Sequence, residues 1–234
     1  MISKIGRKLH GKAEGAREEG RFLDALEFTD KATIAYQKNR DLLGLAEVQA
    51  SRQSTFKQLY RQTGDKNYLI LEKNAAKAAV EIAEESGVKE ALAIPYHNLG
   101  KYYEESGNHK KAAKFFRKAL ENMKNNPPKI HNRLGVIADI KGHLYASEYM
   151  AGDKSALEGA EQSLNELENS GEDKISQYNF DVWLSGAYIR IAQMLRKNNH
   201  QKAKEHLYKA KDIIDINPNL KLRKEQWEKL AKGF

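Results

Sequence analysis

The stretch that decides the fold is PYHNLGKYYEESGNHKKAAKFFRKAL, residues 95–120. In its first half, apolar and small residues recur at helical spacings and share one helix face: Tyr96, Leu99, Gly100 and Tyr103. The second half repeats the pattern with Ala112, Phe115, Phe116 and Ala119. Gly107 stands between the halves and suits the left-handed backbone that ends a helix. The stretch therefore predicts two amphipathic helices joined by a tight turn.

The same pattern recurs along the chain, with turns at positions 20, 64, 107, 152 and 198 and so a period of 43 to 46 residues. Asn198 stands where the other turns have glycine, and we expect it to be left-handed as well. The predicted fold is all-α, a single solenoid of stacked antiparallel hairpins. The expected hairpins cover 1–40, 41–86, 88–126, 128–170 and 174–217, and a capping helix covers about 219–232.

Composition narrows the class of protein further. The chain has 234 residues, of which 40% are hydrophobic and 31% charged, enough apolar surface for a core under a polar exterior. It has no cysteine, which excludes disulfides, thiol nucleophiles and Cys-ligated metals. No apolar run is long enough to span a membrane, and the first residues do not resemble a secretory leader. We therefore expect a cytoplasmic protein.

Residues 95–120 resemble the tetratricopeptide repeat family. The matched positions are Tyr96, Leu99, Gly100, Tyr103, Gly107, Ala112, Phe116 and Ala119. The repeats are about ten residues longer than the common form, which resembles the long-helix repeats of kinesin light chains and of Rap-type and MalT-type regulators. The resemblance implies a right-handed superhelix whose concave groove, lined by the first helix of each hairpin, binds peptides or partner helices. Members are scaffolds and adaptors, and rarely enzymes.

The groove is where we expect the partner-binding residues. These are Arg17, Gln58, Arg61, His97, Asn98, Lys101, Arg133, Lys141 and His143. The set has an excess of basic side chains, which would attract an acidic protein or peptide and steer its approach. Asn98 and Lys101 also stand where a carboxylate clamp of the family could fall, although the neighbouring repeats do not complete one.

The distribution of charge along the sequence is also compatible with partners other than an acidic peptide. The formal net charge is +8. Residues 101–133 and 196–234 each have a net charge of +6, whereas residues 153–174 have a net charge of −5. Basic tracts could contact nucleic acid, and oppositely charged tracts could pair two copies as a homo-oligomer. Nucleic acid is the weaker alternative because glutamates interrupt the tracts and the aromatic residues occupy core positions. We expect no membrane binding.

The sequence contains no motif for phosphate binding, zinc hydrolysis or a nucleophile elbow. Asp139 and His143 are four residues apart and could share a helix face as metal ligands or an acid–base pair, but no third ligand is evident nearby. We therefore predict a non-catalytic protein with no cofactor and no metal. A ligand-sensing regulator is an alternative, which the lack of a further effector segment disfavours. We expect Trp227 to seal the last hairpin.

Overall fold

The computed structural model describes residues 3–128 and 131–234; residues 1–2 and 129–130, which fall in the predicted hairpins 1–40 and 128–170, lie outside the described residues. The described residues form eleven α-helices and no strand. The helices are α1 (Lys4–Glu18), α2 (Phe22–Lys38), α3 (Leu42–Thr63), α4 (Asn67–Glu85), α5 (Ala93–Glu105), α6 (His109–Asn125), α7 (Leu134–Met150), α8 (Ala156–Glu168), α9 (Gln177–Leu195), α10 (His200–Ile216) and α11 (Lys221–Ala231). Two short 3₁₀ helices, η1 (Lys89–Ala91) and η2 (Glu172–Lys174), precede α5 and α9.

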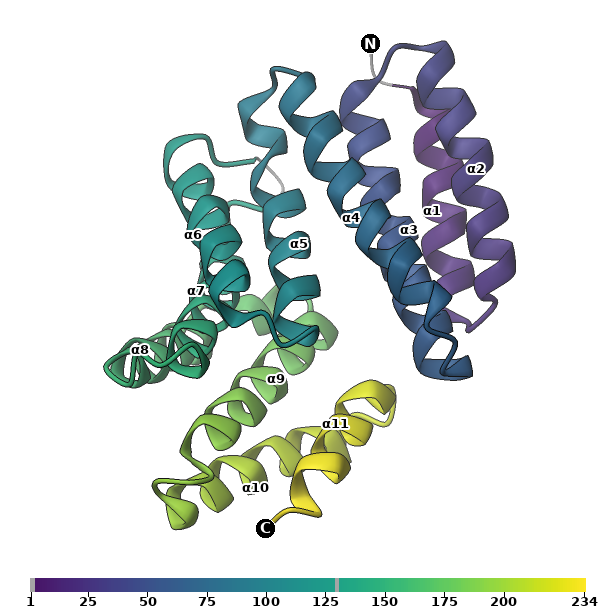
Figure 1. Cartoon of the computed structure of the whole chain (residues 1–234). Coiled ribbons are helices and arrows are strands. Elements are labelled where there is room, and N and C mark those ends of the chain that lie inside the picture. The colour runs from purple at the N-terminus through teal and green to yellow at the C-terminus, as the bar shows by residue number, and fades with distance from the viewer. Residues whose placement is uncertain (1–2, 129–130) are drawn as a thin grey trace.

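Consecutive helices pair as five hairpins, α1/α2 to α9/α10, which stack side by side into the predicted solenoid (Figure 1). Four hairpin turns contain a glycine with positive φ, among them Gly107 at 77°. The fifth turn differs from the prediction, because Asn198 has no positive φ. Instead Asn198 donates a side-chain hydrogen bond to the Tyr149 hydroxyl, and Asn199 caps α10 by accepting from the Lys202 backbone N–H.

Small residues let the helices of a hairpin approach closely. A Cβ added to Gly100 on α5 would lie 2.7 Å from the Phe116 ring on α6, so this crossing requires glycine. Phe116 itself is completely buried, and it packs in one apolar cluster with Tyr96, Leu99 and Ile140 from the neighbouring first helices. Burial of each such side chain stabilises the folded protein by about 1.5–3 kcal/mol. Because each hairpin of a solenoid contacts mainly its neighbours, these contacts hold the stack together.

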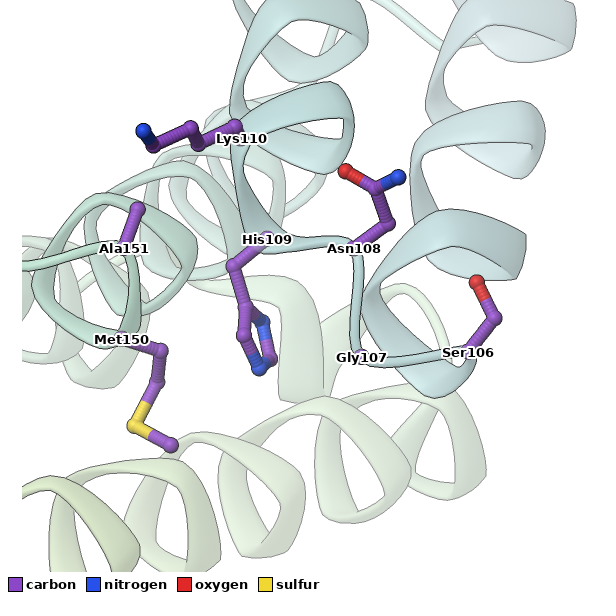
Figure 2. Close-up of a pocket in the computed structure, with 7 residues that line it drawn as sticks. All are labelled: Ser106, Gly107, Asn108, His109, Lys110, Met150 and Ala151. Carbon is purple, nitrogen blue, oxygen red and sulfur yellow. The ribbon is translucent and has the colours of Figure 1, made fainter.

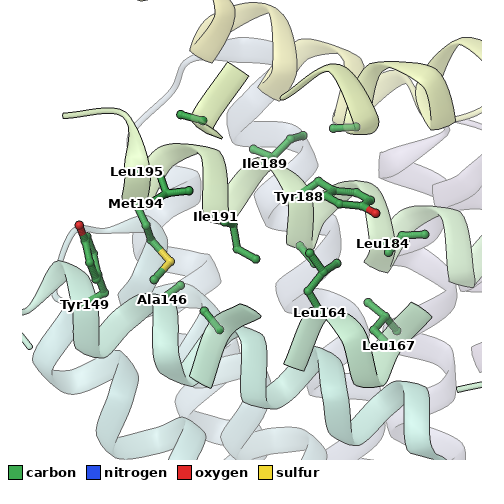
Figure 3. Packing of buried hydrophobic residues seen from close by; sticks show 14 of the residues in the cluster. Ala146, Tyr149, Leu164, Leu167, Leu184, Tyr188, Ile189, Ile191, Met194 and Leu195 are labelled. Carbon is green, nitrogen blue, oxygen red and sulfur yellow. The ribbon is translucent and has the colours of Figure 1, made fainter. Parts of the chain in front are cut away.

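A second apolar cluster holds the C-terminal half together (Figure 3). It brings Leu164 and Leu167 of α8 against Leu184 and Tyr188 of α9. Helix α9 packs against α7, α8, α10 and α11, so it is buried on more than one side. None of the described helices is long and apolar enough to cross a membrane.

Helix α11 closes the end of the stack. It packs on α9 and α10, and the Trp227 indole N–H donates to the Leu207 carbonyl oxygen at 2.8 Å. Trp227 also packs against the C-terminal apolar cluster, so the predicted sealing role is confirmed. The solenoid curves so that α11 returns toward α5, which places the last helix beside the concave surface (Figure 1).

Candidate partner-binding groove

The concave surface holds a cavity of about 1020 Å³, which we call the groove. Its walls come from the first helices α1, α3, α5, α7 and α9 and from α11, with single residues of α2 and α6 at the edge. Nine lining residues are basic: Arg17, Lys57, Arg61, Lys101, Arg190, Arg196, Lys221, Arg223 and Lys229. Three are acidic, namely Glu104, Glu105 and Glu225. The groove is therefore strongly basic.

The structure brings five of the nine predicted site residues together in this groove: Arg17, Gln58, Arg61, Lys101 and His143. The other four do not line it. His97 is buried behind the lining beside Asp139, and Asn98 uses its backbone carbonyl oxygen to accept a hydrogen bond from Gln53 on α3. Without Asn98 in the lining, the carboxylate clamp loses one of its two candidate residues.

Arg133 and Lys141 instead form ion pairs with residues that do not line the groove. Arg133 precedes α7 and forms an ion pair of 2.6 Å with Glu172, whose side chain is 1% exposed. Lys141 pairs with Glu166 of α8 at 2.7 Å. Lys141 and His143 are two positions apart on one helix, which puts them about 200° apart around its axis. They therefore face different neighbours, and only His143 faces the groove.

A buried polar network connects three first helices under the groove surface. The Arg190 guanidinium on α9 donates to His143 Nε2 and to Asp139 Oδ1, both on α7 and both at 2.9 Å. An arginine nitrogen is always a donor, so His143 Nε2 is the acceptor and the imidazole proton is on Nδ1. That Nδ1–H donates to Glu104 Oε2 on α5 at 2.7 Å. The network therefore links α5, α7 and α9.

The network fixes the charge of its members. Burial lowers the pKa of both His97 and His143, so the two imidazoles are neutral at neutral pH. Burial acts to raise the pKa of Asp139, but the charge of Arg190 opposes it, and that pKa lies well below its usual range. Asp139 is therefore ionised, and Arg190 supplies its countercharge.

The third metal ligand that the sequence did not reveal is present in space. Ligand atoms of His97, Asp139 and His143 lie within 4.8 Å of one another. However, Arg190 already hydrogen-bonds two of these three side chains, and its positive charge would repel a metal ion at their centre. The donor set fits an arginine-centred network better than a metal site, and we assign it that structural role.

Two half-buried basic groups of the lining have no carboxylate partner, Lys101 and Arg223. Lys101 has no hydrogen-bond or ion-pair partner among the residues that the structure describes. Burial, followed by the charge of Lys57, lowers its pKa to about 8. Arg223 on α11 donates to the Val182 carbonyl oxygen and to the Gln226 side chain, which are neutral acceptors. Burial and the charge of Arg190 lower the pKa of Arg223 to about 10.

A smaller hollow of about 440 Å³ lies at the α5–α6 turn, where His109 and Met150 face one another (Figure 2). Both residues also line the groove, so this hollow is an extension of its edge. It contains backbone and short side chains of the turn, from Ser106 to Asn108. The groove is the larger and more highly charged of the two, and it is the candidate site.

Lys57, Arg190 and Arg223 are among the basic groove residues that sequence reasoning missed. Lys57 could have been predicted from the sequence, because it stands four positions before Arg61 and therefore shares its helix face. Arg190 likewise follows Gly186 by one turn of α9. Arg223 has no such signal, because it reaches the groove only through the way α11 packs on α9.

Comparison with known proteins agrees with this architecture. Residues 74–125 match the tetratricopeptide repeat model. The crystal structure of BtubC (BKLC) from P. vanneervenii superposes with a TM-score of 0.66 at 19% identity, covering 91% of this chain and 82% of that one. A putative kinesin light chain from Podospora anserina with nearly identical TPR-like repeats gives a TM-score of 0.60 at 14% identity, covering 92% of this chain and 97% of that one. No curated protein matches the sequence.

At these identities the likeness to solved structures is one of fold, and it defines the class of protein: an α-solenoid of long TPR-like hairpins. The matched segment 74–125 includes all eight positions of the repeat motif read from the sequence. Residues 74–125 therefore match a tetratricopeptide repeat, and the described chain shares the fold of solved TPR-like repeat structures. Helical repeats of this type generally serve as protein-interaction scaffolds.

Proposed function

We propose that this protein is a non-catalytic scaffold or adaptor whose groove binds an acidic peptide or partner helix. The observation that carries the proposal is the composition of the groove, nine basic against three acidic side chains on one concave surface. A surface of one sign attracts ligands of the other and raises their association rate. A concave shape along stacked first helices suits an elongated ligand rather than a flat one.

Rigidity supports the same proposal. The network of Glu104, His143, Arg190 and Asp139 holds three first helices together before any ligand arrives. Side chains that are already ordered lose little conformational entropy on binding. The groove is therefore pre-organised, as a binding surface with a fixed preference requires.

The groove also offers apolar contact area for a partner. Met150, Val182, Ile189 and Leu222 line it together with the basic residues. Apolar anchors supply most of the affinity of a typical interface, whereas charges contribute preference and rate. We therefore expect a ligand that combines acidic residues with a few large apolar side chains.

The alternatives have less support. Some groove residues whose pKa values are shifted form hydrogen bonds with other groove residues. For example, His143 Nε2, the atom that would act as a base, accepts a hydrogen bond from Arg190. This supports a non-catalytic role. Single-stranded nucleic acid stacks on free aromatic rings, whereas Tyr103 and Phe115 stack on each other at 5.5 Å. A ligand-sensing regulator would use the same groove, and a second copy would be an acidic partner through residues 153–174.

The proposal is tested by display of a peptide library of graded acidity against the full chain, with recovered peptides measured singly. We expect acidic peptides with apolar residues to be enriched. Arg61→Glu and Lys101→Glu should each weaken their binding about tenfold, whereas Lys77→Glu, on the exposed face of α4, should not. Equal binding by all three variants would overturn the proposal. Preferential binding of RNA that nuclease abolishes would favour the nucleic-acid alternative.

A further inference from the structure

The floor of the groove has more positive than negative charge. Five basic side chains and three carboxylates lie close enough there to influence one another electrostatically, and we call these eight residues the floor cluster. The basic members are Lys57, Arg61, Lys101, Arg190 and Arg223, and the carboxylates are Glu104, Glu105 and Asp139. With every member ionised, the floor cluster has a net charge of +2. The members come from α3, α5, α7, α9 and α11.

The carboxylates are already engaged within the floor cluster. Glu105 forms an ion pair with Lys57 and lies 3.8 Å from Arg61. Asp139 is paired with Arg190, and Glu104 accepts from neutral His143. No carboxylate is left for the remaining two cations.

Those two cations are Lys101 and Arg223. Among the described residues Lys101 has no hydrogen-bond or ion-pair partner, and the acceptors of Arg223 are a carbonyl and an amide oxygen. Both residues line the groove, and the charge of Arg223 is among those that lower the pKa of Lys101. Like charges that are partly buried together are unfavourable unless an anion joins them. The floor cluster therefore has an excess of positive charge that an anion would offset.

The geometry points to an anion subsite on this floor: we propose that Lys101 and Arg223 bind a phosphomonoester dianion carried by the partner peptide. A phosphomonoester has a charge of about −1.5 to −2 at neutral pH, so it offsets more of the positive excess of the floor cluster than a carboxylate does. Arginine binds phosphate through paired N–H groups, and lysine binds it as a point charge. The inference rests on the proposed function and names the chemistry of its ligand.

One further carboxylate lies near the floor cluster. Glu72 of α4 is buried behind Lys57, and it does not line the groove. Burial raises its pKa to about 7, so Glu72 is only partly ionised at neutral pH. It offsets the charge of Lys57 and leaves Lys101 and Arg223 without a carboxylate contact.

The first experiment uses small probes on the full chain: phenyl phosphate and benzoate, which share a ring and differ in the anion. We expect phenyl phosphate to bind with one-to-one stoichiometry and at least about tenfold more tightly than benzoate, by calorimetry. In ¹⁵N-labelled protein the Lys101 ammonium should shift on titration, and its pKa should rise. Equal affinity for the two probes, or a Lys101 signal that phenyl phosphate does not move, would overturn the subsite.

The second experiment uses variants. Lys101→Met and Arg223→Met should each reduce phenyl phosphate affinity about tenfold or more, and the matched control Lys77→Met should leave it unchanged. Because no residue would lose a hydrogen bond or ion pair when Lys101 is replaced, the Lys101→Met variant should keep the melting temperature of the parent protein. Should a variant fail to fold, the wild-type ¹⁵N titration decides. Equal affinity in Lys101→Met and Lys77→Met would count against the subsite.

A third measurement separates this inference from the proposed function. One acidic peptide is compared with serine, glutamate and phosphoserine at a single position. The inference expects the phosphoserine form to bind tightest and to lose that advantage in Lys101→Met. Binding that Arg61→Glu weakens but phosphorylation does not strengthen would retain the groove and overturn the subsite. If phenyl phosphate binds but none of the three peptides does, the subsite is retained for a free phosphate compound and the peptide proposal is overturned.

Discussion

Arg190 Nη1 donates a hydrogen bond of 2.9 Å to His143 Nε2, and this contact joins α9 to α7 beneath the groove. The same guanidinium neutralises Asp139 one helical turn before His143. One arginine thus fixes the tautomer of a histidine, the charge of an aspartate and the spacing of two hairpins. The binding surface therefore depends on a buried polar network as much as on the apolar core.

The first prediction follows from that dependence. Arg190→Met should destabilise the protein by roughly 3 kcal/mol, because it leaves the Asp139 carboxylate buried without a countercharge. Urea unfolding followed by circular dichroism measures the change. Lys141→Met is the matched control: it removes a cation from a pair whose members are about a third exposed, and should cost less than about 1 kcal/mol. Similar losses in both variants would show that Arg190 is not the centre of the network.

Protonation of the two buried histidines should weaken the fold as the pH falls. The pKa values of His97 and His143 are lowered by burial, so the unfolded chain binds their protons more readily than the folded protein does. The contribution of these histidines to the free energy of unfolding should therefore be full above the unfolded histidine pKa of 6.5 and fall as the pH drops below it, whereas protonation of Glu72 acts in the opposite direction. Losses from Asp139 and Glu104, whose pKa values are lowered, follow only below the ordinary carboxyl range.

Urea unfolding at a series of pH values tests this window. The His97→Phe, His143→Phe double variant should show a shallower decline between about pH 6.5 and 5 than the parent protein. Loss of the Glu104 hydrogen bond will lower its overall stability, so the slope and not the absolute value is the readout. An unchanged slope would assign the acid sensitivity to other groups.

Glu72 should destabilise the protein at neutral pH. Burial raises its pKa to about 7, so folding favours the protonated form, and the penalty of ionisation grows as the pH rises from 4.5 to about 7 and is constant above. Glu72→Gln should raise the free energy of unfolding by about 1–3 kcal/mol at pH 8 and by little at pH 4. Glu81→Gln, on an exposed position of the same helix, is the control and should change neither value. A gain independent of pH would contradict this account.

The helices and their pairing could be predicted because they depend on local spacing. The motif around Gly100 and Phe116 specifies a hairpin wherever it occurs, and each hairpin packs mainly on its neighbours. Asn198 shows the limit, since its turn is stabilised by a contact with Tyr149 of the preceding hairpin. The position of α11 is likewise set by contacts distant in sequence, so Arg223 was not predictable.

The groove could be predicted only as a surface, not residue by residue. Periodicity separates the apolar face of a helix from the rest, but the polar part of a first helix faces both the groove and adjacent helices. His143 and Lys141 illustrate this, because both are polar positions of α7 and only His143 lines the groove. Whether a polar side chain faces the groove or an adjacent helix depends on how the hairpins are rotated relative to each other. The spacing of apolar residues does not predict this rotation.

Arg133 and Arg61 provide the last prediction, because the sequence assigned both to the groove and the structure separates them. Arg133 pairs with the almost fully buried Glu172, whereas Arg61 lines the groove and lies 3.8 Å from a partly exposed Glu105. Arg133→Met should therefore destabilise the fold by roughly 3 kcal/mol through the orphaned Glu172 carboxylate. Arg61→Met should change stability by less than about 1 kcal/mol and weaken acidic-peptide binding instead. Urea unfolding and peptide titration of the two variants make the comparison, and the reverse pattern would show that the binding surface lies toward Arg133.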